Sequence, residues 1–209
     1  MKLKSLLALS MSLAAVVLIT GCTSYRITPT AASITPPKAR TPIPATVGIN
    51  QVEQKLQGGF PDMVHSVKQS LDESQLFKEV YYPVRASDRT DGQINLRLSS
   101  SFQMDGALFP KSFFTGFFMF LPASFVTYTH HYVAECRLDL FKGDRLLKTY
   151  TAKSQVEVVH KIFAPMAEIE KQGVEATVKQ LGSDLVTQMI NDRASLERLL
   201  LPQPAPAKL

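Results

Sequence analysis

Cys22 carries the most reactive side chain near the start of this sequence, because a cysteine thiol is a nucleophile that alkylates readily near neutral pH. Before it come Lys2 and Lys4 and then an uncharged apolar run over residues 6–19. This run is too short to span a bilayer as a stop-transfer helix and is typical of an export signal. An ordinary secretory signal ends in small residues, whereas here Leu18-Ile19-Thr20-Gly21-Cys22 ends in an aliphatic residue, two small residues and a cysteine.

This ending resembles the lipobox of bacterial lipoproteins. In that family the thiol receives a diacylglycerol, the signal is cut just before the cysteine, and the new amino group is acylated. The resemblance implies that residues 1–21 are a signal peptide and that Cys22 binds membrane lipid through its acyl chains, such as palmitate. Each buried CH₂ contributes about 0.8 kcal/mol, so two or three chains hold a protein on a membrane essentially permanently. In the Gram-negative sorting rule, an aspartate after the cysteine retains the protein at the inner membrane. Thr23 therefore implies the periplasmic face of the outer membrane.

Composition limits the other classes of function. Removing residues 1–21 leaves 188 residues, enough for one domain with a core, and lowers the net charge from +5 to +3 because two lysines are lost. Lysines and arginines do not cluster, and no basic and aromatic motif occurs, so we expect no nucleic-acid partner. If Cys22 is lipidated, Cys136 is the only remaining thiol and no internal disulfide is possible. Cys136 alternates with Ala134 and Leu138 on an apolar face, which predicts a buried structural cysteine.

Three histidines and two aspartates are the other residues that could support chemistry. His130 and His131 are neighbours on a predicted strand and point to opposite faces, so we do not expect them to form a metal site with His160. Asp88 and Asp91 lie in a polar turn, where aspartates bond to nearby backbone. An enzyme would need two or more members of one set to converge, and their predicted faces do not favour it; the set is His130, His160, Asp88, Asp91 and Cys136. No nucleotide, zinc or G-x-S-x-G motif occurs. We expect no cofactor, no metal and no catalysis.

A strongly apolar segment, residues 106–126, offers a binding surface. It has no Asp, Glu, Lys or Arg after Lys111. A transmembrane helix needs about 20 apolar residues, but Pro110 and Pro122 bracket only 11. A second interpretation is an apolar hairpin that packs into the core or faces a partner. A third is a loop that enters lipid or seals a subunit interface. In that case the contact residues are Phe113, Phe114, Phe117, Phe118, Phe120 and Leu121.

The surrounding elements follow from composition and periodicity. Five prolines between residues 29 and 44 predict an extended tether over 22–45, which could reach on the order of 70 Å at about 3.1 Å per residue. A single domain is expected over 46–195, with a Pro-rich tail over 196–209. Period-two and period-3.6 patterns predict an α+β two-layer sandwich: a mixed or antiparallel sheet, two helices on one face, and the apolar insertion before a long β-hairpin. The predicted helices cover 61–73 and 167–192, and the hairpin strands cover 125–141 and 146–159.

This order of elements is similar to small outer-membrane lipoproteins with an anticodon-binding-like α/β domain. The residues that carry the similarity are Ile19–Cys22, 77–80, 117–122 and 146–150. Members of that group act chiefly as scaffolds, ring subunits or accessory factors. The resemblance implies a non-catalytic accessory subunit of an envelope assembly or export complex, with an envelope protein or a second copy of the chain as partner. The alternative is a carrier or extractor of lipid-like molecules, with a pocket lined by the same phenylalanines.

Overall fold

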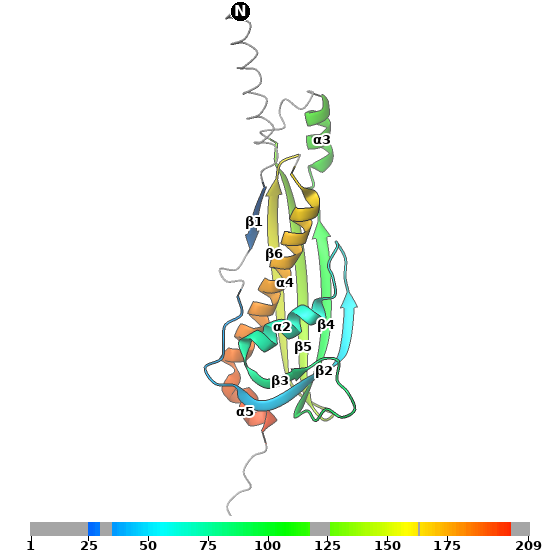
Figure 1. The fold of residues 1–209 in the computed structure, drawn as a ribbon. Coiled ribbons are helices and arrows are strands. Elements are labelled where there is room, and N and C mark those ends of the chain that lie inside the picture. Colours follow the sequence, from blue (N-terminus) through cyan, green and yellow to red (C-terminus); the bar gives the residue numbers. More distant parts are fainter. Residues whose placement is uncertain (1–24, 30–34, 118–125, 163, 202–209) are drawn as a thin grey trace, which may run out of the picture.

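The computed structural model describes residues 25–29, 35–117, 126–162 and 164–201. These residues form a six-stranded mixed sheet in the order β1-β6-β5-β4-β2-β3, with helices on one face (Figure 1). The predicted α+β sandwich is confirmed. The strands are β1 (Tyr25–Pro29), β2 (Ile43–Lys55), β3 (Phe77–Tyr81), β4 (Gly92–Gln103), β5 (Tyr128–Lys142) and β6 (Arg145–His160). The helices are α2 (Met63–Ser74), α3 (Leu108–Phe117), α4 (Met166–Asn191) and α5 (Arg193–Leu200).

The centre of the sheet is the predicted β-hairpin. β5 and β6 pair antiparallel from Lys142↔Arg145 to Tyr128↔His160. Gly143 has φ +57° in the connecting turn, a conformation that glycine adopts without steric cost. β4 pairs antiparallel with the other edge of β5, and β2 and β3 then add parallel strands. Alternation along β5 therefore sends every second side chain into the core.

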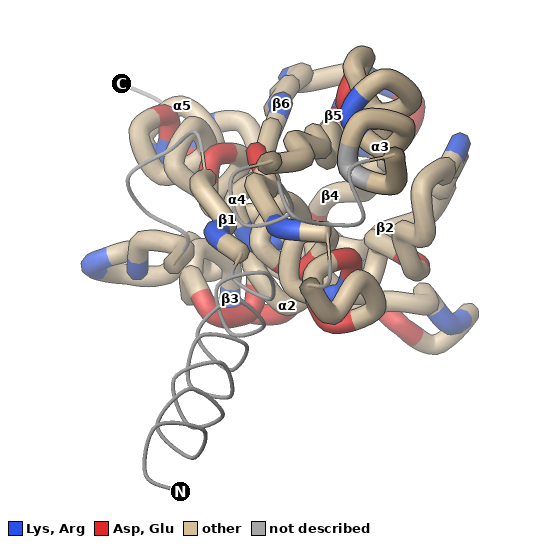
Figure 2. Tube along the Cα trace, turned by 90° about the horizontal axis from the view of Figure 1, so that it is seen from above, with Lys and Arg blue, Asp and Glu red and all other residues tan. Residues whose placement is uncertain are grey.

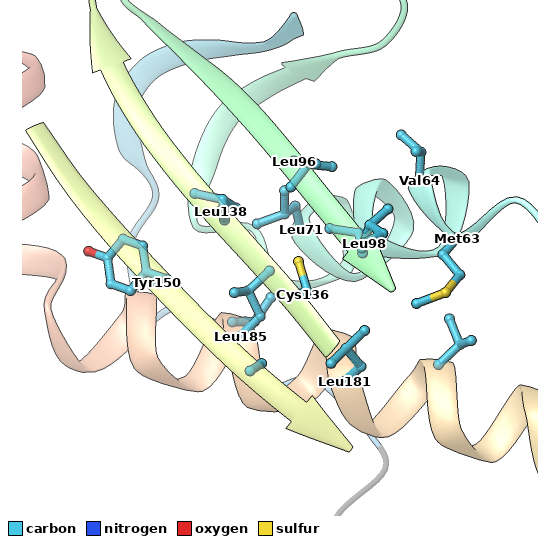
Figure 3. Packing of buried hydrophobic residues seen from close by; sticks show 14 of the residues in the cluster. Met63, Val64, Leu71, Leu96, Leu98, Cys136, Leu138, Tyr150, Leu181 and Leu185 are labelled. Atoms are coloured by element: carbon cyan, nitrogen blue, oxygen red, sulfur yellow. The ribbon is translucent and has the colours of Figure 1, made fainter. Parts of the chain in front are cut away.

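The core lies between the sheet and the helices α2 and α4 (Figure 3). α2 begins at Met63, two residues after the predicted start, because the Asp62 carboxylate caps the helix by accepting a hydrogen bond of 3.0 Å from the Val64 amide. α4 buries the predicted stripe of apolar side chains against the sheet. The stripe comprises Val174, Val178, Leu181, Leu185 and Met189. Cys136 is buried among these side chains, and burial raises the pKa of its thiol to about 12, as expected for a structural cysteine.

The predicted tether differs from the structure in part. Tyr25–Pro29 form β1 and pair with β6, and β2 begins at Ile43 rather than near Thr46. Between them, Ala39 is buried and its amide donates to the Ser74 carbonyl. Proline is compatible with an edge strand, as at Pro29 in β1, and with a strand irregularity, as at Pro44 in β2, so these parts of the predicted extended segment join the sheet. Only residues 23 and 24 then lie between Cys22 and the first residue of β1, and the reach of about 70 Å does not apply.

The predicted C-terminal boundary is also wrong. Residues 193–200 form α5, whose Leu196 and Leu200 are buried against the domain. The Lys142 ammonium also donates to the Leu200 carbonyl at 2.8 Å. The domain therefore extends past residue 195, because two leucines four residues apart form a helical apolar stripe. The proline-containing residues 202–209 lie outside the described part of the chain.

Gly182 lies where α4 passes α2, and its missing side chain sets the distance between the helices. A Cβ there would lie 2.1 Å from Ser70 Oγ and 2.8 Å from Ser70 Cβ. In an open helix, alanine is about 1 kcal/mol more favourable than glycine. We nevertheless expect Gly182→Ala to lower the free energy of unfolding by about 1–3 kcal/mol, measured by urea denaturation, because the contact is overpacked.

Two further variants test the cause of this effect. Ser70→Gly in the Gly182→Ala background should restore part of the lost stability, since it removes both clashing atoms. Gly116→Ala in α3 is the matched control, because no atom of the described residues lies within 4 Å of a Cβ there, and it should not destabilise the protein. A Gly182→Ala variant as stable as wild type would show that α2 and α4 can separate at no cost.

Candidate functional site

Strand direction brings several chain segments to one end of the sheet. β4 and β6 end there, whereas β5 begins there, and α3 connects β4 to β5 (Figure 1). α4 begins six residues after β6 ends. β1 also starts at this end, since Tyr25 is in register with His160. We call this the α3 end; the β5–β6 turn lies at the opposite end.

The apolar insertion forms α3 at this end, and its aromatic side chains face solvent. Phe109, Phe113 and Phe117 are 81%, 64% and 68% exposed. The rings of Phe113 and Phe117 stack with their centroids 5.9 Å apart. The core-filling interpretation is therefore wrong for these residues, because the sheet ends before α3 begins. Phe114 is also exposed, whereas Phe118, Phe120 and Leu121 lie outside the described residues.

α3 has ten residues. None of the helices in the described ranges is long and apolar enough to cross a membrane.

Seen from above, Lys and Arg are interspersed with Asp and Glu around the domain, so neither sign of charge forms a single face (Figure 2). The apolar side chains of α3 thus stand out from a surface of mixed charge.

Asp105 holds α3 to the sheet. Its carboxylate accepts hydrogen bonds from the Lys111 ammonium, from the Ala107 amide at 2.8 Å and from the Thr129 amide at 3.2 Å. Lys111 also donates to the Thr127 carbonyl at 2.9 Å. The hydrogen bond from Lys111, followed by that from the Ala107 amide, lowers the pKa of Asp105 to about 2. The carboxylate therefore connects the first turn of α3 to the start of β5.

A cavity of about 500 Å³ lies between α3 and the sheet. Its apolar walls come from the end of β4, α3, the start of β5 and the start of α4. They include Phe102, Met104, Leu108, Tyr132, Ile162 and Met166. This volume falls within the range of about 300–1,000 Å³ that is typical of small-molecule sites.

The polar part of the cavity wall includes Ser112 and Glu170 and, on the strands, Tyr128, His130 and His160. Tyr128 and His130 share the buried face of β5, and His160 is the cross-strand partner of Tyr128. The rings of His130 and His160 are stacked with centroids 4.9 Å apart, and Tyr128 stacks on His160 at 5.5 Å. Desolvation, followed by the neighbouring His160, lowers the pKa of His130, which favours its neutral form.

The expectation that these histidines would not converge is wrong for one pair. His131 points to the other sheet face, as predicted, and lies 3.5 Å from the Gln155 amide nitrogen. His130 and His160 meet because antiparallel register places them diagonally across β5 and β6. The predicted hairpin is sufficient to place His130 next to His160, but only when the register between its two strands is known. Among the described residues, no group of three or more His, Cys, Asp or Glu side chains is placed to hold a metal ion.

Asp88 and Asp91 have the predicted structural role. Asp88 accepts a hydrogen bond from the Arg85 amide at 2.7 Å, and Asp91 accepts one from the Thr46 amide at 2.8 Å. The Asp88 bond is the local one that turn chemistry predicts. Asp91 differs, because its partner Thr46 lies 45 residues away and the bond connects the turn to β2.

A second, larger hollow of about 1210 Å³ lies beside α2 and α4. Many of its lining side chains are polar or charged, among them Glu73, Lys171, Glu175 and Lys179. Pro29 and Thr35, on either side of the undescribed residues 30–34, also line it. The smaller cavity at the α3 end combines apolar walls with buried polar atoms, and we therefore take it and the exposed face of α3 as the candidate site.

No protein-family model matches the sequence, and neither does any curated protein. Solved structures similar to this chain include a protein of family DUF330 from Xanthomonas campestris, 11% identical, covering 81% of this chain and 96% of that one, with a TM-score of 0.44. Another is a minor lipoprotein from Acinetobacter baumannii, with 11% identity, coverages of 74% and 94%, and a TM-score of 0.36. A third is the PelC dodecamer from Paraburkholderia phytofirmans, with 10% identity, coverages of 78% and 96%, and a TM-score of 0.35. Bacterial lipoproteins recur among these structures.

The Asp105 linkage predicts how stability depends on pH. The pKa of its carboxyl is lower in the folded protein than the ordinary 3.8, so its contribution is present above pH 4 and is lost as the pH falls toward 2. We expect Asp105→Asn to lower the free energy of unfolding by about 1 kcal/mol at pH 6, after allowance for solvent screening. The difference from wild type should disappear near pH 2, as measured by urea denaturation at several pH values.

Asp72→Asn is the matched control, because Asp72 forms an exposed ion pair with Lys68 within α2. Such pairs contribute about 0–1 kcal/mol, so this variant should change stability little. An Asp105→Asn variant whose deficit is equal at pH 6 and pH 2 would contradict the electrostatic role of the carboxylate.

Proposed function

We propose that this chain is a non-catalytic lipoprotein of the bacterial cell envelope that contacts a membrane-bound partner protein through the exposed face of α3. In this proposal Cys22 is lipidated, Thr23 directs the protein to the outer membrane, and the domain acts at its periplasmic face as an accessory subunit. The observation that carries the proposal is the exposure of the α3 phenylalanines at the end of the domain where the chain arrives from Cys22.

The position of β1 supports this orientation. Tyr25 is paired at the α3 end, and three peptide units separate it from Cys22. Each residue spans at most about 3.6 Å, so a lipidated Cys22 lies within about 11 Å of Tyr25. The α3 end of the domain is then held close to the membrane surface, and the opposite end, with the β5–β6 turn, points away from it.

The chemistry of α3 supports a contact that excludes water. Burying one phenylalanine side chain contributes about 1.5–3 kcal/mol, so several such side chains favour association once a lipid anchor confines the protein to the membrane. Monomeric soluble proteins rarely expose a contiguous apolar patch of this kind without a function. A partner protein in the same membrane would bury these side chains and so account for the exposed patch. The anchor would favour this contact, because it confines both proteins to one membrane.

The cavity behind α3 favours a second candidate function, a carrier or extractor of lipid-like molecules. Its apolar wall opens at the end of the domain that the anchor holds near lipid. α3 covers this cavity through Leu108 while its phenylalanines face outward. In this function the phenylalanines contact the bilayer rather than a protein.

Photocrosslinking in intact cells tests the first function. With a photoreactive residue at Phe117 and the membranes separated afterwards, we expect a discrete protein adduct in the outer-membrane fraction. Adducts to lipid alone would favour the carrier, and an adduct between two copies of the chain would identify the partner as the chain itself.

Charge substitutions on α3 test whether the contact is apolar. For this test the photoreactive residue is placed at Phe109, a third exposed position. Combining Phe113→Glu with Phe117→Glu should then reduce the yield of the adduct at least 10-fold, because two carboxylates would have to be desolvated. Since both side chains are exposed, the free energy of unfolding should change by less than about 0.5 kcal/mol. Leu146→Glu is the matched control: Leu146 is exposed at the opposite end of β6, and the adduct should persist. Normal association of the double variant would refute α3 as the contact surface.

A further inference from the structure

Three polar atoms in the wall of the α3 cavity have no hydrogen-bond partner among the described residues. They are Tyr128 Oη, His130 Nδ1 and His160 Nε2. Their side chains are 3%, 4% and 6% exposed. Buried polar atoms in folded proteins are nearly always hydrogen-bonded, and three unpartnered atoms on adjoining rings are therefore unusual. Their common position on one wall indicates a site for a polar group of a ligand.

The hydrogen-bonding roles of these atoms define that group. His160 Nδ1 lies 2.9 Å from the Lys161 carbonyl, so Nδ1 carries the hydrogen and donates it. In the neutral ring Nε2 is then an acceptor, which needs a donor from the ligand. The Tyr128 hydroxyl can both donate and accept. A ligand O–H group matches the pair, because it donates to Nε2 of His160 and accepts from Tyr128.

The charge around the cavity disfavours an anionic group. Glu170 is the one acidic or basic side chain, apart from the histidines, among the described residues that line the wall. Its negative charge opposes a phosphate or a carboxylate in this partly desolvated site. A neutral imidazole at His130, favoured by its lowered pKa, also supplies no positive charge. The polar group is therefore neutral.

The remaining wall is suited to an alkyl chain. Met104, Leu108, Ile162 and Met166 contribute apolar side chains to the lining from the segments around α3 and the start of α4. Methionine side chains adapt to flexible apolar ligands because they are unbranched and polarisable. The cavity thus combines a small polar wall with a longer apolar one.

We infer that this cavity binds a single-chain amphiphile with a neutral O–H head, such as a monoacylglycerol or a fatty acid in its protonated form. Tyr128 and His160 bond the head, His130 offers a third bond, and the chain lies along the apolar wall. The inference rests on the carrier function and names its ligand, and it does not require α3 to bind a protein.

Photolabelling of the full lipidated chain tests the site. The mature protein is reconstituted in phosphatidylethanolamine vesicles with a diazirine-bearing monopalmitoylglycerol, irradiated, digested and mapped by mass spectrometry. We expect labelled peptides from the starts of β5 and α4. Unlabelled monopalmitoylglycerol should compete at a concentration several-fold lower than methyl palmitate, which has no O–H donor, or lysophosphatidic acid, which is anionic. Competition by palmitic acid distinguishes a carboxyl head from a hydroxyl head.

Tyr128→Phe removes one oxygen and leaves the packing intact. The half-saturation concentration of the photolabel should rise about 2- to 10-fold, the effect of one lost hydrogen bond to a neutral group. His131→Phe is the matched control, because its side chain lies on the other face of β5, and it should leave labelling unchanged. Label confined to the exposed face of α3, equal competition by methyl palmitate, or unchanged labelling of Tyr128→Phe would each overturn the inference.

Transfer of a fluorescent monoacylglycerol between donor and acceptor vesicles separates the site from the carrier function. Site-specific labelling without transfer would leave the site and refute the carrier. Transfer that is normal in Tyr128→Phe would leave the carrier and refute the role of the polar wall.

Discussion

The length of the β5–β6 hairpin is the constraint on which the rest of the structure depends. β6 has 16 residues, a length of about 53 Å at about 3.3 Å per residue. α4 has 26 residues, a length of about 39 Å at 1.5 Å per residue. One helix therefore cannot cover the buried face of the sheet from end to end. α5 supplies Leu196 and Leu200 near the turn end, and α3 covers the other end only partly. The cavity results from that incomplete cover.

The contrast between the two ends is chemical as well as geometric. In the middle of the sheet, the buried positions of β5 are Ala134, Cys136, Leu138 and Leu140, which pack against α2 and α4 with no polar atom that needs a strong partner. Toward the α3 end, the same face carries Tyr128 and His130. Polar side chains at buried positions reduce stability unless they are bonded. Their rings stack on His160, but they leave polar atoms unbonded among the described residues, which is why the proposed binding site is placed here.

α3 and β1 together determine which surface of the domain lies closest to the N-terminal segment. β1 adds an edge strand that begins beside His160, so a chain anchored upstream of Tyr25 brings α3 close to its anchor. The Asp105 carboxylate fixes the first turn of α3 to β5, which leaves the phenylalanines directed outward. If Cys22 is lipidated as proposed, a free tether would allow the domain to turn any face toward the membrane. Pairing of β1 with β6 would then remove that freedom and place the α3 end nearest the anchor.

The sequence by itself determined the features that depend on local periodicity and composition: the helices α2 and α4, the β5–β6 hairpin, the burial of Cys136, the turn role of Asp88, and the opposite faces of His130 and His131. These follow from alternation, capping and helical spacing, which neighbouring residues encode. Only the tertiary structure decided that Tyr25–Pro29 pair with β6, that Phe113 and Phe117 face solvent, and that His130 meets His160. Each of these depends on the register between segments distant in the chain or on the length of sheet that a helix can cover. No local pattern of residues encodes the register or the extent of helical cover, because both are set when the strands and helices assemble.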